Sequence, residues 1–241
     1  MPDAPDWYRF LPGSERHILG DLGEHAVRVG SPVVYDRRGE MVYANNGDTG
    51  LSGLMVFLAG TGAAVIPTAE FSLTSGYGLK FIAGSTDSNK AQIVKTNVAP
   101  EVSSMGLEVA LALLTAWYQV QINLVVYSTD WVRVARVRIR DTEEDVAIKD
   151  SDGNYYSIID TGELDDSWGV FHHLKLVVDF DTGKWDRIMF DEVETDISTY
   201  TLEASGASTF RAIQWDVGLY GREGYNDEMV VGRVVLTANE P

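Results

Sequence analysis

The chain contains no cysteine, and its 36 acidic residues outnumber its 19 basic ones, which gives a net charge of −17. Without cysteine there is no disulfide framework and no thiol chemistry. A strongly acidic chain is a poor partner for nucleic acids and for anionic membrane surfaces. We therefore expect no nucleic-acid partner.

Long apolar runs are also missing. The most apolar segment, residues 51–67, is interrupted by Gly53, Gly60 and Gly62. It falls short of the roughly 20 apolar residues that a membrane span requires. Residues 1–17 have neither a basic start nor an apolar run, so the sequence predicts no signal peptide and no membrane insertion. A virion-associated, particle-associated or cytoplasmic location is expected.

Short segments of alternating apolar and polar residues fill most of the chain. Clear examples are Leu107–Leu113, Phe171–Phe180 and Thr209–Tyr220, although the first is also compatible with a helix because Ala and Leu favour one. Gly, Asn and Asp separate these segments. Many short strands with frequent turns predict an all-β fold, a two-sheet antiparallel jelly-roll sandwich with an irregular N-terminal extension. We expect an arm and a hairpin over residues 1–49 and the jelly-roll domain over 50–241.

The most informative segment is the hairpin at residues 117–140. Its first half alternates between apolar residues and amides, which predicts a strand with one buried face. In its second half the apolar phase changes between Val134 and Val137, so we infer a β-bulge at Ala135–Arg136. The resulting register gives one face of amides and guanidinium groups, in which Arg136 lies near Asn123, Arg138 faces Gln121 and Arg140 faces Gln119.

A resemblance to a known family rests on the segment 168–192, WGVFHHLKLVVDFDTGKWDRIMFDE. It resembles the strand–turn–strand signature of laminin-G-like domains, which belong to the concanavalin A-like lectin and glucanase superfamily. Residues 76–81 are similar to an early core strand, and residues 225–231 to the closing strand. The resemblance covers about residues 50–238 and implies a two-sheet jelly roll. Members include sugar-binding modules, glycan hydrolases and lyases, adhesion domains and virion proteins, so fold alone implies no chemistry.

No group of residues predicts catalysis. Glu192, Glu194 and Asp196 are similar to the acidic motif of the superfamily's glucanases, but the last two acids are swapped and Glu192 falls in a predicted turn. His172 and His173 are adjacent on a strand and point to opposite faces, so they do not chelate one ion. Residues 150–154 begin like a calcium loop, but Tyr155 occupies the sixth position, where such a loop needs glycine, so the segment is interpreted as a turn. No cofactor is predicted, except that the superfamily's calcium sites near the last strand make Asp227 a candidate Ca²⁺ ligand.

Three functions remain open for this sequence. The first is a non-enzymatic structural or adhesive protein of an assembly, such as a virion or particle-surface component, with copies of itself or other structural chains as partners. The second is a carbohydrate-binding module, and the third is a glycan hydrolase or lyase. The arginine row either pairs internally with acids such as Glu108 or residues 143–145, meets a second copy, or binds an acidic glycan. In the glycan case the site consists of Arg136, Arg138, Arg140, Gln119, Gln121, Asn123, Trp117 and Trp131, with the tryptophan rings stacking on sugars.

Overall fold

The computed structural model of the protein describes residues 39–45, 47, 49–70, 77–85, 89–98, 104–114, 117–162, 164 and 170–241. Within these ranges every regular element is a β-strand, and no helix is long and apolar enough to cross a membrane. Most of the predicted N-terminal arm and hairpin lies outside the described residues. The strands are β1 (Glu40–Asn45), β2 (Met55–Ala59), β3 (Ala64–Thr68), β4 (Gly78–Ile82), β5 (Lys90–Asn97), β6 (Ser104–Leu113), β7 (Gln119–Tyr127), β8 (Val132–Arg140), β9 (Asp145–Lys149), β10 (Tyr155–Asp160), β11 (His172–Asp179), β12 (Lys184–Phe190), β13 (Val193–Asp196), β14 (Glu203–Ser205), β15 (Ala212–Tyr220) and β16 (Glu228–Ala238).

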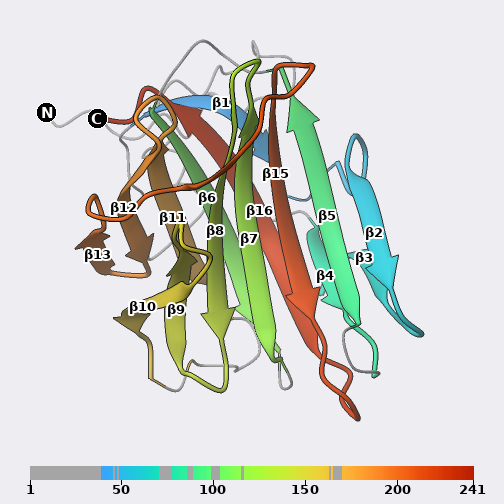
Figure 1. The fold of residues 1–241 in the computed structure, drawn as a ribbon. Coiled ribbons are helices and arrows are strands. Elements are labelled where there is room, and N and C mark those ends of the chain that lie inside the picture. The colour runs from blue at the N-terminus through green and yellow to red at the C-terminus, as the bar shows by residue number, and fades with distance from the viewer. Residues whose placement is uncertain are drawn as a thin grey trace, which may run out of the picture.

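The strands form two antiparallel sheets that pack face to face (Figure 1). The back sheet has the order β13-β12-β11-β6-β16-β4-β3, and β1 also pairs with β16. The front sheet has the order β10-β9-β8-β7-β15-β5-β2, and β14 also pairs with β8. The predicted all-β two-sheet sandwich is therefore confirmed. Residues 40–45, at the end of the predicted N-terminal unit, are built into the back sheet.

The core lies between the two sheets, where alternate residues of each strand meet. Trp185 and Trp215, at 1% and 0% exposure, are its largest fully buried side chains. The segment for which helix and strand both remained open is the strand β6, which pairs with β11 and β16. Two flanking strands give this backbone a hydrogen-bond partner on each side, and that tertiary context outweighs the modest helix propensity of Ala and Leu.

The predicted bulge in β8 is wrong. The β7–β8 register runs without a shift from Gln119↔Arg140 to Tyr127↔Val132, so Val132 and Val134 share the outer face with the arginines. Arg133 instead takes the inward phase at the end of the sandwich. Its guanidinium donates to the carbonyl oxygens of Phe180 and Asp181 and lies 4.4 Å from the ring centroid of Trp131. An arginine near a sheet end satisfies its donors there, which is why alternation of apolar residues misplaced the phase.

Candidate binding site on the front sheet

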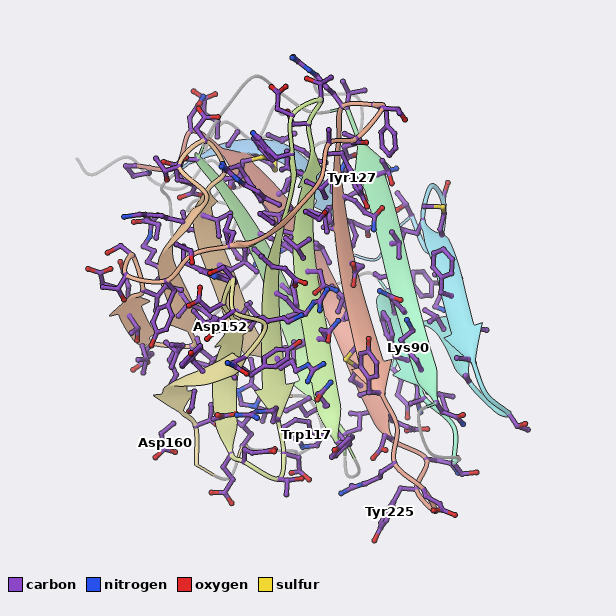
Figure 2. The ribbon with its side chains drawn as sticks, viewed as in Figure 1. Lys90, Trp117, Tyr127, Asp152, Asp160 and Tyr225 are labelled. Atoms are coloured by element: carbon purple, nitrogen blue, oxygen red, sulfur yellow. The ribbon has the colours of Figure 1, made fainter. Side chains whose placement is uncertain are left out.

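The outer face of the front sheet carries side chains in straight rows across the strands. Figure 2 views this face, with Lys90 on β5 and Asp160 on β10 marking its two sides. At the usual strand spacing of about 4.8 Å, a row across seven strands is roughly 29 Å long. The register aligns one such row, which we call the central row, through Phe57, Gln92, Gly218, Gln121, Arg138, Ala147 and Ser157.

Two positions of the central row have very small residues. Gly218 has no side chain, and a Cβ built there would approach its nearest neighbour, Gln92 Cγ, only to 3.4 Å, an ordinary contact. Ala147, the position next to the end at Ser157, has only a methyl side chain and is completely buried. Taller residues flank the row on both sides, with Asp216, Asn123 and Arg136 in one flanking row and Lys90, Tyr220, Gln119, Arg140 and Asp145 in the other.

Arg138 lies in the middle of this face with its guanidinium fixed in place. Its Nε donates to Gln121 Oε1 at 3.1 Å, and its guanidinium carbon lies 3.9 Å from the ring centroid of Tyr155. Among the described residues no carboxylate lies within ion-pair distance of Arg138. The terminal nitrogens therefore keep their charge available, while the stacking and the hydrogen bond hold the side chain in one orientation.

The other two arginines of the row are paired within the chain. Arg140 forms a two-pronged contact with the buried Asp145, at 2.7 Å for Nε and 2.5 Å for Nη2, and this hydrogen bonding raises the pKa of Arg140. Arg136 donates from Nε to Asn123 Oδ1 at 3.0 Å, and its Nη1 lies 3.8 Å from Glu203. The internal pairing that the sequence left open thus occurs fully for Arg140 and weakly for Arg136, and Arg138 has no carboxylate partner within the described ranges.

A buried carboxylate lies beside the central row. Asp216 Oδ1 accepts hydrogen bonds from Gln92 Nε2 and Asn123 Nδ2, both at 2.6 Å. Burial raises the pKa of Asp216, against the opposing effect of these two hydrogen bonds. Burial also raises the pKa of the Tyr220 phenol, four residues further along β15. The protonated phenol is a hydrogen-bond donor at neutral pH and a poor general base.

The amides and guanidinium groups of this face are groups that hydrogen-bond anions and hydroxyl groups. Hydrolysis requires two carboxylates with separate roles near one bond. On this face Asp145 is held by Arg140, and Glu203 lies 3.1 Å from Lys149. Of these three carboxylates only Asp216 has no ion pair with another described residue; neutral amides hold it, and the charges of Lys90 and Arg136 act on it from beyond ion-pair distance.

The predicted site residues do not all come together. The pairs Arg138–Gln121, Arg136–Asn123 and Arg140–Gln119 are neighbours as expected. Trp117 belongs to the hydrophobic core with 5% exposure, and Trp131 packs at the edge of the core under Arg133. Neither ring presents an open face beside the arginine row. Sequence reasoning missed Gln92, Gly218 and Tyr155, whose place is set by strand pairings between distant segments.

Asp227, the candidate calcium ligand, is fully buried and directly precedes β16. Its Oδ2 accepts from the backbone N–H of Arg222 at 2.8 Å, and its Oδ1 lies 3.2 Å from Arg222 Nε without hydrogen-bond geometry. Burial raises the pKa of this carboxyl. No group of three metal-ligating side chains occurs in the described part of the chain. Calcium at Asp227 stays a prediction, and Arg222 already supplies a positive charge there.

The side chains of the remaining acidic and histidine motifs contact other groups of the same chain. Glu194 lies on the edge strand β13 of the back sheet, and Asp196 accepts from the backbone N–H of Ser198. Asp152 accepts from the backbone N–H of Asn154 and closes the β9–β10 turn. His172 Nδ1 lies 2.8 Å from Asp191 Oδ2.

No protein family and no curated protein matches the sequence. Among solved structures, the chain is similar to a sialidase, with a TM-score of 0.54, 10% identity and 83% of this chain covered. The matched part is 19% of that sialidase, so the chain spans about a fifth of its length. It is also similar to a peanut lectin crystallised with a 9mer peptide, with a TM-score of 0.51, 9% identity, and 83% and 97% of the two chains covered. At these identities the likeness shows the fold, a jelly-roll β-sandwich of the concanavalin A-like type.

Proposed function

We propose that the protein binds acidic glycans, carrying carboxylate or sulfate groups, along the central row of the front sheet. The observation that carries this proposal is Arg138, which is held by Gln121 and Tyr155 and has no carboxylate partner among the described residues. A fixed guanidinium fork matches the two oxygens of a carboxylate or sulfate. Because its orientation is set before binding, little side-chain entropy remains to be lost.

The surroundings of Arg138 support the same ligand class. Gln92 and Gln121 offer amides to sugar hydroxyls, and Phe57 is half exposed at the end of the row, where its ring can stack on a sugar. Basic side chains gather on this face of an otherwise acidic protein, namely Lys90, Arg136, Arg138, Arg140 and Lys149. A polysaccharide chain would contact this face at Arg138 and at the exposed ring of Phe57.

The test compares Arg138→Ala with Arg211→Ala, a matched control that removes an equally charged but exposed arginine outside the rows. The probes are polygalacturonate for carboxylates, heparin for sulfates and dextran as a neutral glycan, measured by isothermal titration calorimetry. Loss of a charge-assisted contact worth about 1.5–3 kcal/mol predicts roughly 10- to 100-fold weaker binding for Arg138→Ala. Arg138→Lys keeps the charge but not the fork, so we expect an intermediate loss.

Two results would refute glycan binding at this site. One is equal affinity of Arg138→Ala and Arg211→Ala for every probe. The other is binding of dextran as strong as that of the acidic probes, since the guanidinium would then contribute nothing to selectivity. Affinity for the acidic probes should also fall as salt is added, because added ions screen charged contacts.

The second candidate is the assembly role predicted from the sequence. The specific observation in its favour is the edge strand β2, whose residues Met55, Phe57 and Leu58 are about half exposed at 48%, 50% and 51%. Exposed apolar side chains on a sheet edge are typical of contact surfaces. A virion or particle surface as the setting of such an assembly stays a prediction. Native mass by light scattering tests this role, and a monomer at every concentration would exclude it.

A further inference from the structure

Each of the two sheets has a terminal strand at either end of its order. Three of these four strands carry features that discourage pairing with another chain. Strand β10 has a register shift between Ser157 and Ile159, and β13 is four residues long with exposed Glu194. Strand β3 contains Pro67, which lacks a backbone N–H donor. Bulges, charges, short length and proline are the usual means of blocking edge-to-edge association. The fourth terminal strand, β2, has the sequence MVFLA and none of these features.

The chain segment that carries β2 also lacks charge, although Lys90 on the neighbouring strand β5 pairs with Ala59. No charged residue occurs between Thr49 and Ala69, although the chain as a whole carries a net charge of −17. In a two-fold symmetric contact each surface meets itself, so any charge near the axis would meet a like charge. An uncharged segment of this length in an acidic chain therefore fits a second copy of the same chain. It offers no charge that would select a basic or an acidic partner.

We infer that two copies of this chain associate by antiparallel pairing of β2 with β2, centred on Phe57. In this register Phe57 lies opposite Phe57 of the second copy, Met55 opposite Ala59, and Val56 opposite Leu58. A large side chain thus meets a small one on either side of the axis, and the two rings pair on the outer face. The backbone groups on the edge of β2 that no described strand pairs would bond those of the second copy.

The pairing joins the two central rows end to end, because Phe57 is the last residue of that row. Arg138 lies four strand spacings from Phe57, so nine spacings separate the two Arg138 side chains. At about 4.8 Å per strand this is roughly 43 Å along one continuous sheet face. A dimer with two such sites would bind a long polyanion more tightly than a single site does, which is the one consequence that rests on the proposed function.

The absence of cysteine makes the register directly testable. Phe57→Cys introduces a single thiol that would face its own copy at a spacing compatible with a disulfide. Leu58→Cys faces Val56 instead, and Val193→Cys places a thiol at equal exposure on β13 at the opposite end of the back sheet. Under mild oxidation we expect a covalent dimer from Phe57→Cys well before either of the other two variants gives one.

Sedimentation equilibrium supplies a second, independent measurement. Wild-type protein should be dimeric at micromolar concentration, and added salt should strengthen the dimer by screening the repulsion between two acidic chains. Leu58→Glu, which lies outside the central row, should lose the dimer, whereas Val193→Glu should keep it. A monomeric wild type, or equal cross-linking rates of the three cysteine variants, would overturn the inference. Arg138→Ala should leave the dimer intact whether or not the protein binds glycans. The sedimentation result therefore tests the dimer independently of the glycan-binding proposal.

Discussion

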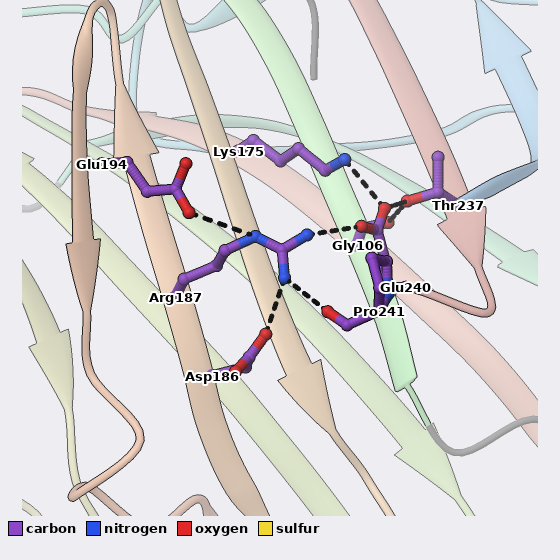
Figure 3. Close-up of polar contacts among 8 residues, drawn as sticks. All are labelled: Gly106, Lys175, Asp186, Arg187, Glu194, Thr237, Glu240 and Pro241. Carbon is purple, nitrogen blue, oxygen red and sulfur yellow. Dashed lines mark hydrogen bonds and ion pairs between the residues drawn. The ribbon is translucent and has the colours of Figure 1, made fainter. Parts of the chain in front are cut away.

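Replacing Glu240 with alanine should lower the free energy of unfolding by about 3–5 kcal/mol, the range found when one partner of a buried ion pair is removed. The Glu240 carboxylate is completely buried on the outer side of the back sheet (Figure 3). Its Oε1 lies 2.8 Å from Lys175 Nζ and accepts from Thr237 Oγ1 at 2.5 Å, and its Oε2 lies 2.8 Å from Arg187 Nη2. One carboxylate thus contacts two buried cations and a hydroxyl.

Burial decides the size of this effect, and the chain offers a matched control. Glu228 and Lys80 also lie 2.8 Å apart, but their side chains are 30% and 19% exposed. In the Glu240 contacts the side chains of Lys175 and Arg187 are only 4% and 7% exposed. Water screens the exposed pair, so Glu228→Ala should cost less than about 1 kcal/mol. Although the two ion pairs have the same distance, the loss in the free energy of unfolding is expected to be several-fold larger for Glu240→Ala than for Glu228→Ala.

The assay is equilibrium unfolding in urea followed by tryptophan fluorescence. A lower midpoint with an unchanged slope identifies a change in stability alone. Glu240→Gln keeps the volume and one acceptor oxygen but loses the charge, so we expect a cost between those of the two alanine variants. If Glu240→Ala and Glu228→Ala shift the midpoint equally, the buried cluster does not stabilise the fold in the way argued here.

Three further predictions concern charges elsewhere in the sandwich. Asp216→Asn keeps an acceptor for both amide donors and removes a negative charge near Arg136, so affinity for heparin should rise several-fold in calorimetry, whereas Asp130→Asn on the exposed β7–β8 turn should not change it. Arg133→Ala breaks the link to the carbonyl oxygens of the back sheet and should cost about 1.5–3 kcal/mol in urea unfolding; a cost no larger than that of Arg138→Ala would contradict the link. Burial and the nearby Arg233 lower the pKa of His173 from 6.5 to about 4. As the pH falls from 6.5 to 4, His173 therefore becomes protonated in the unfolded chain while it stays neutral in the folded one. Stability should therefore drop by on the order of 2–3 kcal/mol between pH 7 and pH 4 relative to His173→Gln, and parallel pH profiles of the two proteins would rule this out.

Local alternation predicted the strands that carry the site. The β7–β8 hairpin is a contact between neighbouring segments, and a face of amides opposite arginines follows from its turn and its period of two. The same reasoning failed at Arg133, because alternation assumes that an inward position holds an apolar side chain. A long side chain at a sheet end escapes this rule by bonding the carbonyl oxygens of Phe180 and Asp181.

The composition of the central row was beyond sequence reasoning for a different reason. Gln92 and Gln121 are brought to either side of Gly218 by pairings of β15 with β5 and β7, which join distant parts of the chain. Without those pairings no pattern tells Gln92 apart from any other polar strand residue. Strand pairing also gives the three arginines different partners, since only Arg140 lies opposite an aspartate on β9.

Cations on both sheets have carboxylate partners in the chain, whereas Arg138 has none among the described residues, and this contrast locates the candidate site. On the outer side of the back sheet the cations Lys175 and Arg187 both contact Glu240, and Arg233 lies 3.7 Å from Glu108. Such cations have their carboxylates within the chain and contribute to stability. On the front sheet Arg138 is oriented as firmly, but by an amide and an aromatic ring that leave its charge uncompensated. A guanidinium that is held in place without a carboxylate partner adds little to the stability of the fold. Its fixed orientation and available charge suit it to binding an anion from outside the chain.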